Sequence, residues 1–100
     1  MSTCGGFGHD NRAATAEEQA ILDGVKGDVE AKLAKNFNHF RAISYVTQVV
    51  AGTNYIFKVK ADEDYIHVKV AKPLPHTGQP PFLMHVDTGN HTHESPITPI

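Results

Sequence analysis

Residues 54–71 read NYIFKVKADEDYIHVKVA, which are two alternating runs joined by the acidic turn Asp62-Glu63-Asp64. Apolar and polar residues alternate in both runs: Tyr55, Phe57 and Val59 against Lys58 and Lys60, then Ile66, Val68 and Val70 against His67 and Lys69. Alternation with period two is typical of strands that cover a core with one face. The stretch therefore predicts an antiparallel hairpin in a sheet with one covered and one solvated face.

Two further strands are expected on either side of this hairpin. Residues 42–50 are rich in β-branched and aromatic side chains, and residues 82–86 form a shorter apolar run. The intervening segment 72–81 contains four of the six prolines, which predicts a loop. The polar residues 1–12 are expected to form a flexible arm, and residues 87–100 an irregular tail interrupted by prolines.

A helix is predicted ahead of the sheet. Thr15 is a good N-cap residue, and Glu18 three positions later completes a capping box. Apolar residues then recur every four positions: Ile21, Val25, Val29, Leu33 and Phe37. This stripe drifts slowly around the helix, as suits a helix lying obliquely on a twisted sheet. The expected fold class is α+β, with one long helix packed across a four- to five-stranded antiparallel sheet.

The composition indicates one soluble domain spanning residues 1–100. Apolar residues make up 40% of the chain, and nine Lys and Arg residues face eleven Asp and Glu residues. That balance offers no basic patch for a nucleic acid, and no segment approaches the roughly 20 apolar residues that span a bilayer. With Cys4 as the one cysteine and no signal-peptide pattern, we expect a reducing, cytoplasmic location, with the nucleus as an alternative.

The connection between the first two expected strands breaks the usual pattern. A tight turn should be polar, whereas Gln48-Val49-Val50-Ala51-Gly52 offers only Gly52 as an obvious turn residue. Val49 and Val50 either end the strand half-buried or form an apolar tip that inserts into a partner. Burying one valine contributes about 1.5–3 kcal/mol, whereas a nanomolar complex needs about 12 kcal/mol. A binding tip would therefore need further contact segments beside it.

The expected topology supplies one such segment. In an antiparallel meander, alternate connections fall at the same end of the sheet, so residues 48–52 and Leu74-Pro75-His76 should share an edge. The N-terminal arm around Gly5 and Gly6 is a second candidate. Together these three segments would make a composite binding surface.

These segments resemble the cystatin family. Gln48-Val49-Val50-Ala51-Gly52 is the full QVVAG pentapeptide of the cystatins, and the arm glycines and Leu74-Pro75 resemble the other two parts of the cystatin wedge. The length, the missing disulfides and the run from Cys4 to Val86 resemble type 1 cystatins, or stefins, in particular.

The resemblance implies reversible, tight-binding inhibition of papain-like cysteine proteases such as cathepsins B, H, L and S. The protease-binding residues would be Cys4, Gly5, Gly6, Gln48, Val49, Val50, Ala51, Gly52, Leu74, Pro75 and His76. Gly5 and Gly6 both fit the arm glycine of the family, and that choice stays open. The alternative is a cystatin-fold module that binds another protein through the same edge without inhibiting proteases.

Other functional signals are weaker. A flexible terminus cannot hold a histidine base beside Cys4, so we expect no enzyme activity, and a Cys4-linked dimer is a simpler use of the thiol. His91 and His93, with His76 and His85, are interpreted as surface residues rather than metal ligands, and no cofactor is expected. The chain is expected to be a monomer, with domain swapping at the 48–52 hairpin as an alternative.

Overall fold

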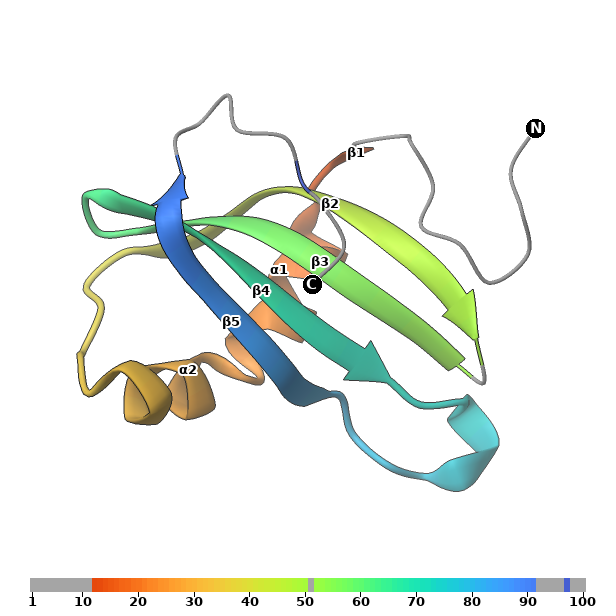
Figure 1. Ribbon diagram of the computed structural model, residues 1–100. Coiled ribbons are helices and arrows are strands. Elements are labelled where there is room, and N and C mark those ends of the chain that lie inside the picture. Colours follow the sequence, from red (N-terminus) through yellow and green to blue (C-terminus); the bar gives the residue numbers. More distant parts are fainter. Residues whose placement is uncertain (1–11, 51, 92–96, 98–100) are drawn as a thin grey trace.

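The computed structural model describes residues 12–50, 52–91 and 97. Its strands form one five-stranded antiparallel sheet in the order β1-β2-β3-β4-β5 (Figure 1). In chain order the elements are β1 (Arg12–Ala13), α1 (Ala16–Asp23), α2 (Lys26–Leu33), β2 (Phe40–Val50), β3 (Gly52–Ala61), β4 (Asp64–Lys72), the 3-10 helix η1 (Pro75–Thr77) and β5 (Phe82–His91). The predicted α+β class and the antiparallel sheet are confirmed.

The first helix begins at the predicted capping box. The backbone N–H of Thr15 donates to Glu18 Oε1 at 2.8 Å, and the Thr15 hydroxyl donates to the same oxygen at 2.5 Å. These bonds, with the hydroxyl bond as the larger contribution, hold the pKa of Glu18 below its ordinary value. Because Glu18 is only 8% exposed, its charged form depends on these donors.

The expected single long helix is in fact divided in two. Val25 has φ −112° and ψ 3°, outside helical geometry, and its N–H bonds to Leu22 O rather than four residues back. Gly24 and Gly27 lie on either side, and glycine lowers helix stability by about 1 kcal/mol relative to alanine. The break lies where helical propensity is weakest, and Leu22 and Val25 on its two sides are both fully buried.

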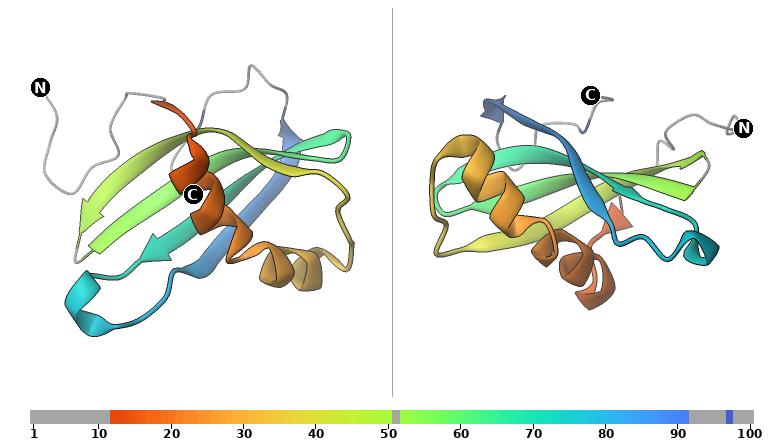
Figure 2. Two further views of the ribbon diagram at one scale, coloured as in Figure 1. Left: turned by 180° about the vertical axis from the view of Figure 1, so that it is seen from behind. Right: turned by 90° about the horizontal axis from the view of Figure 1, so that it is seen from below.

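The core lies between the helices and one face of the sheet. Figure 2 shows both helices on the same side of the sheet. The predicted stripe and the predicted inner faces of the strands meet there, and the buried members are Ile21, Leu22, Val25, Val29, Phe37, Phe40, Ala42, Phe57, Val59, Ala61, Ile66, Val68, Val70 and Val86. Phe37 and Phe40 stack with ring centroids 5.6 Å apart, which links the end of the helical region to β2.

Two polar side chains connect distant elements. The Gln19 side chain donates to Phe40 O at 3.0 Å and accepts from the N–H of Ala42 at 2.8 Å, which joins α1 to β2. Asp62 Oδ1 accepts the N–H groups of Asn38 and His39 at 2.9 and 2.8 Å. The acidic turn therefore does more than face solvent, because Asp62 holds the segment that leads into β2.

The second face of the sheet is less solvated than the alternating pattern predicts. Lys58 is 4% exposed and His67 is fully buried, although both belong to the predicted polar face. In the register of the sheet, Lys58 lies opposite His67 and His67 lies opposite Asp87, so the three positions are neighbours across three strands. Alternation along one strand carries no information about the residues opposite it on the neighbouring strands, so it misjudges the burial of this face.

The predicted boundaries of the arm and the tail also need correction. Arg12 belongs to β1 and pairs with Tyr45, rather than to a flexible arm, and residues 1–11 lie outside the described part. The strand β5 continues to His91, so residues 87–91 are not irregular as expected. Pairing of Asp87 and His91 with β4 supplies backbone hydrogen bonds that sequence polarity does not reveal. Of the remaining tail, only Ile97 is described.

Replacing Thr15 with alanine should destabilise the protein by about 1 kcal/mol at pH 7, which lowers Tm by about 4–8 °C. Since the folded pKa of Glu18 lies below its unfolded value, this stabilisation is full above pH 4.5 and is lost as pH falls through the folded pKa. The Tm difference between Thr15→Ala and the wild type, followed by circular dichroism, should therefore shrink in acid. A pH-independent difference would contradict the role assigned to Glu18.

Candidate functional site

The two predicted binding connections lie at the same end of the sheet. The strand β2 leads into β3 there, and β4 leads into the loop that carries η1 (Figure 1, lower right). The predicted meander is thus confirmed, and it brings Gln48–Gly52 and Leu74–His76 to one edge. We call this end of the molecule the loop edge.

The first connection is tighter than a loop. Gln48 pairs with Asn54, Val49 with Thr53 and Val50 with Gly52, so the ladder continues to the tip. Val49 and Val50 are therefore strand residues by backbone, which is compatible with both sequence interpretations. Their side chains and all of Ala51 lie outside what the structure describes.

Gly52 brings the two connections into contact. Its φ is +113°, a conformation that side chains other than glycine's rarely tolerate. A Cβ atom at this position would lie 2.6 Å from Lys72 O, 3.2 Å from Pro73 Cα and 3.3 Å from Leu74 N. Gly52 is thus required twice, for its backbone angle and for the close approach of the second loop.

The second loop is held by its own hydrogen bonds. Leu74 O accepts the backbone N–H of Thr77 at 3.1 Å and the Thr77 hydroxyl at 2.7 Å, and Thr77 Oγ1 accepts the N–H of Gln79 at 3.3 Å. Leu74 and His76 are exposed, while Pro75 begins η1. The loop therefore presents Leu74 from a folded turn rather than from an extended segment.

An aromatic cluster supports the stem of the first hairpin. Tyr55 stacks on Phe57 at 5.5 Å and contacts Tyr45 at 5.8 Å between ring centroids. Burial, and secondarily the charge of Glu18, raises the pKa of Tyr55, so its hydroxyl stays protonated at neutral pH. These rings join β2 and β3 just below the tip, which favours a rigid hairpin.

The three arm residues of the predicted site, Cys4, Gly5 and Gly6, lie outside the described residues. The structure does describe the start of the path that leads to them. The strand β1 is antiparallel to β2, with Arg12 opposite Tyr45 and Ala13 opposite Ser44. Because β2 runs toward the loop edge and β1 is antiparallel to it, the N-terminal end of β1 faces the loop edge.

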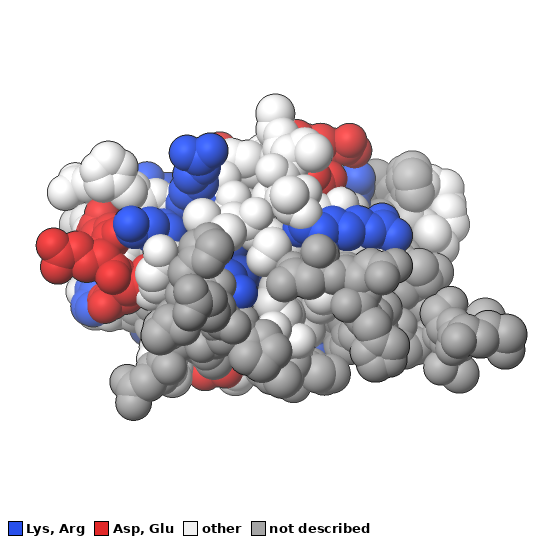
Figure 3. Space-filling view, turned by 90° about the horizontal axis from the view of Figure 1, so that it is seen from above, with Lys and Arg blue, Asp and Glu red and all other residues white. Residues whose placement is uncertain are grey.

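Among the described residues, the charges on the face shown in Figure 3 point to no second site. On the face shown in Figure 3, the basic and acidic side chains of the described residues are interspersed rather than gathered into a field of one sign. Within the described ranges, no three His, Cys, Asp or Glu residues come close enough to hold a metal ion. Among the described helices, none has the length and apolar character needed to cross a membrane.

Sequence reasoning missed two exposed residues beside the loop edge. Phe82 is 49% exposed and Met84 is 44% exposed, and both line a groove with Leu74. The run 82–86 predicts only a strand, and its pattern of apolar residues suggests burial. One signal in the sequence could have revealed this exposure. Four of the five residues 82–86 are large and apolar, which is more than one buried face of a strand can hold.

These features define an α+β protein whose helices cover one face of an antiparallel sheet and whose two hairpin connections form one edge. The family model described as "Cystatin domain" matches residues 6–91, and the chain belongs to the cystatin family. This is a family of cysteine protease inhibitors and not of enzymes.

The chain is similar to the type 1 members of this family. It is 45% identical to stefin-C of Bos taurus over 91 residues, which cover 90% of this chain and 89% of that protein. It is 45% identical to cystatin-B (stefin B) of Homo sapiens over 82 residues, covering 81% and 84% of the two chains, and 46% identical to cystatin-B of Macaca fuscata fuscata over the same shares. The predicted resemblance to type 1 cystatins is confirmed, and the chain is similar to stefin B among them.

Replacing Gly52 with alanine should force the two connections apart. Strain from the positive φ and displacement of the Lys72 carbonyl should together cost about 2–3 kcal/mol. Gly78→Ala is the matched control, because Gly78 also has positive φ (+67°) but no atom within 4 Å of where its Cβ would lie. Equal losses of Tm in the two variants would show that the contact with Lys72 is not needed.

Proposed function

We propose that this protein is an intracellular, reversible, tight-binding inhibitor of papain-like cysteine proteases such as cathepsins B, H, L and S. It would block the active-site cleft with a tripartite wedge made of the N-terminal arm, Gln48–Gly52 and Leu74–His76. The observation that carries the proposal is the backbone contact between Gly52 and Lys72–Leu74. Because of it, the two connections would enter a cleft as one body.

The energetics favour a composite edge over a single tip. One valine or leucine contributes about 1.5–3 kcal/mol when it is fully buried, far below the roughly 12 kcal/mol of a nanomolar complex. Several apolar side chains on one rigid edge can reach that value, because a preformed edge loses little conformational entropy on binding. The internal hydrogen bonds of Leu74 and Thr77 support such preorganisation.

The chain has the length needed for the arm to join this edge. Continuing the pairing of Arg12 with Tyr45 in extended form would bring Gly6 level with Ala51 and Gly5 level with Gly52. Six residues of extended chain from Arg12 span about 20 Å, and the five from Tyr45 to Val50 span about 17 Å. Either glycine can therefore serve as the point where the arm bends, and the arm would occupy the non-primed side of the cleft.

Inhibition without cleavage follows from this arrangement. The arm would turn away at the glycine before it reaches the catalytic thiol, and the two connections would fill the primed side. No peptide bond of the inhibitor would then lie in attack geometry, although substrate is excluded. We propose cytoplasmic, and alternatively nuclear, localisation and a monomeric state, with domain-swapped or Cys4-linked dimers as alternatives.

The purified protein should inhibit papain stoichiometrically, with an inhibition constant in the nanomolar range or below. The measurement is a titration of papain activity against increasing inhibitor, analysed for tight binding. Recovery of full papain activity after dilution or denaturation of the inhibitor would show that binding is reversible. No inhibition at micromolar concentration would leave the non-inhibitory interaction module as the better description.

Deleting residues 1–6 should weaken papain binding mainly through faster dissociation, because the two connections still guide association. Stopped-flow association and displacement experiments would separate the two rate constants. Truncation before residue 4 is the matched control, since it removes chain but keeps Cys4, Gly5 and Gly6. An unchanged dissociation rate in the longer deletion would exclude the arm from the wedge.

A further inference from the structure

An apolar groove lies next to the second loop. Leu74 is 39% exposed, Phe82 49% and Met84 44%, and among the described residues these are the exposed large hydrophobic side chains. All three line the same groove, together with Ala71 and Pro73. Three large apolar side chains gathered in one place differ from single exposed ones, which are normal on protein surfaces.

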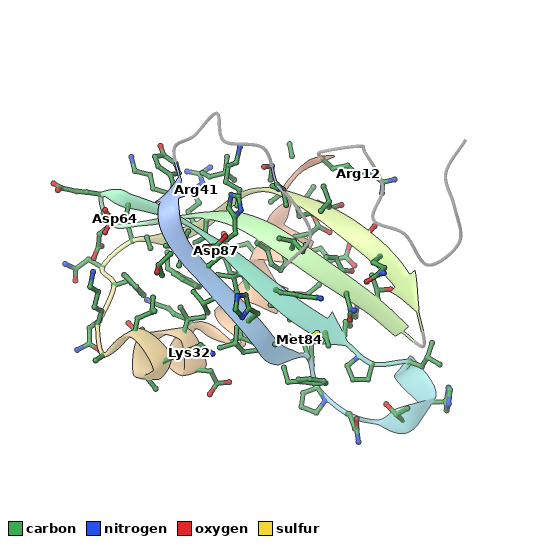
Figure 4. The ribbon with its side chains drawn as sticks, viewed as in Figure 1. Arg12, Lys32, Arg41, Asp64, Met84 and Asp87 are labelled. Carbon is green, nitrogen blue, oxygen red and sulfur yellow. The ribbon has the colours of Figure 1, made fainter. Side chains whose placement is uncertain are left out.

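A β-bulge contributes to the exposure of Met84. Val70 pairs with Leu83 and Lys69 pairs with His85, so Met84 is an extra residue without a partner on β4. A bulge of this kind turns a side chain away from regular alternation. Leu83 and Val86 still pack against the core, whereas Met84 lies at the loop end of β5, beside the end of β4 (Figure 4).

The groove is continuous with the proposed protease-binding edge. Leu74 belongs to both, and Pro73 lies between the groove and Gly52, whose added Cβ would be 3.2 Å from Pro73 Cα. A partner that covers Leu74 from the loop edge would therefore also reach Phe82 and Met84, with the part of its surface that adjoins the Leu74 contact.

We propose that Phe82 and Met84 extend the protease-binding edge beyond the three-part wedge, and that they pack against an apolar rim of the protease beside its primed subsites. The proposal rests on the proposed function. It adds a fourth contact segment, on β5, that differs from the arm and both connections. Its residues would contribute to selectivity, because they would contact protease surface outside the catalytic cleft.

A second copy of this chain is a less suitable occupant. The strand β5 is an edge of the sheet, and another strand could in principle pair with it. The bulge at Met84 interrupts the regular spacing of the ladder near the groove, which disfavours strand addition there. The apolar side chains are thus presented for packing by a partner's side chains rather than for pairing by a backbone.

The test compares the double variant Phe82→Thr/Met84→Ser with the wild type in binding to papain and to two other papain-like proteases. Loss of both side chains should weaken binding to at least one protease by about 10-fold, mainly through faster dissociation. His85→Thr is the matched control, because His85 is exposed on the same strand but does not line the groove. It should leave binding within about 2-fold of the wild type.

The outcomes separate this proposal from the proposed function. If the folded double variant inhibits every protease as strongly as the wild type does, the proposed β5 contact is overturned and the inhibitor function stands. If sedimentation shows that the groove variant abolishes self-association of the wild type and leaves inhibition unchanged, the occupant is a second copy and the proposal fails. If the double variant has a lower Tm than the wild type, the milder single variant Met84→Gln serves the same test.

Discussion

The backbone of Gly52 lies so close to Lys72 that no side chain fits between them, and the relation of the two hairpin connections depends on this approach. Pairing of Thr53 with Lys72 continues the sheet up to the same point. The loop edge is therefore an extension of the sheet rather than a pair of independent loops. A surface fixed in this way loses little entropy on binding, which suits the proposed insertion into a protease cleft.

Much of the fold could be predicted from local patterns. Alternation identified the strands β3 and β4, and Thr15 with Glu18 fixed the helix start, because both signals act within a few residues. Features set by tertiary contacts could not be predicted in this way. Gly24 and Gly27 weaken the helix but do not by themselves locate the break at Val25, and the burial of His67 depends on its position between two neighbouring strands.

The candidate site shows the same division. That Gly52 and Leu74 share an edge follows from counting strands, and chain order alone is enough for that inference. The contact between their backbones can be recognised only in the three-dimensional structure, and the same holds for the exposure of Phe82. Met84 is the clearest case, since its orientation depends on a bulge that no local sequence pattern announces.

The stabilising contacts and the proposed binding contacts lie at opposite ends of the molecule. At the end opposite the loop edge, Asp62 and Gln19 join the helical region to the sheet with side-chain hydrogen bonds. At the loop edge, exposed apolar side chains remain on an edge strand, where they favour unwanted strand pairing. The bulge in β5 reduces that tendency without burying them. Apolar residues that are kept exposed and protected from strand addition are better explained by a partner surface than by the stability of the fold.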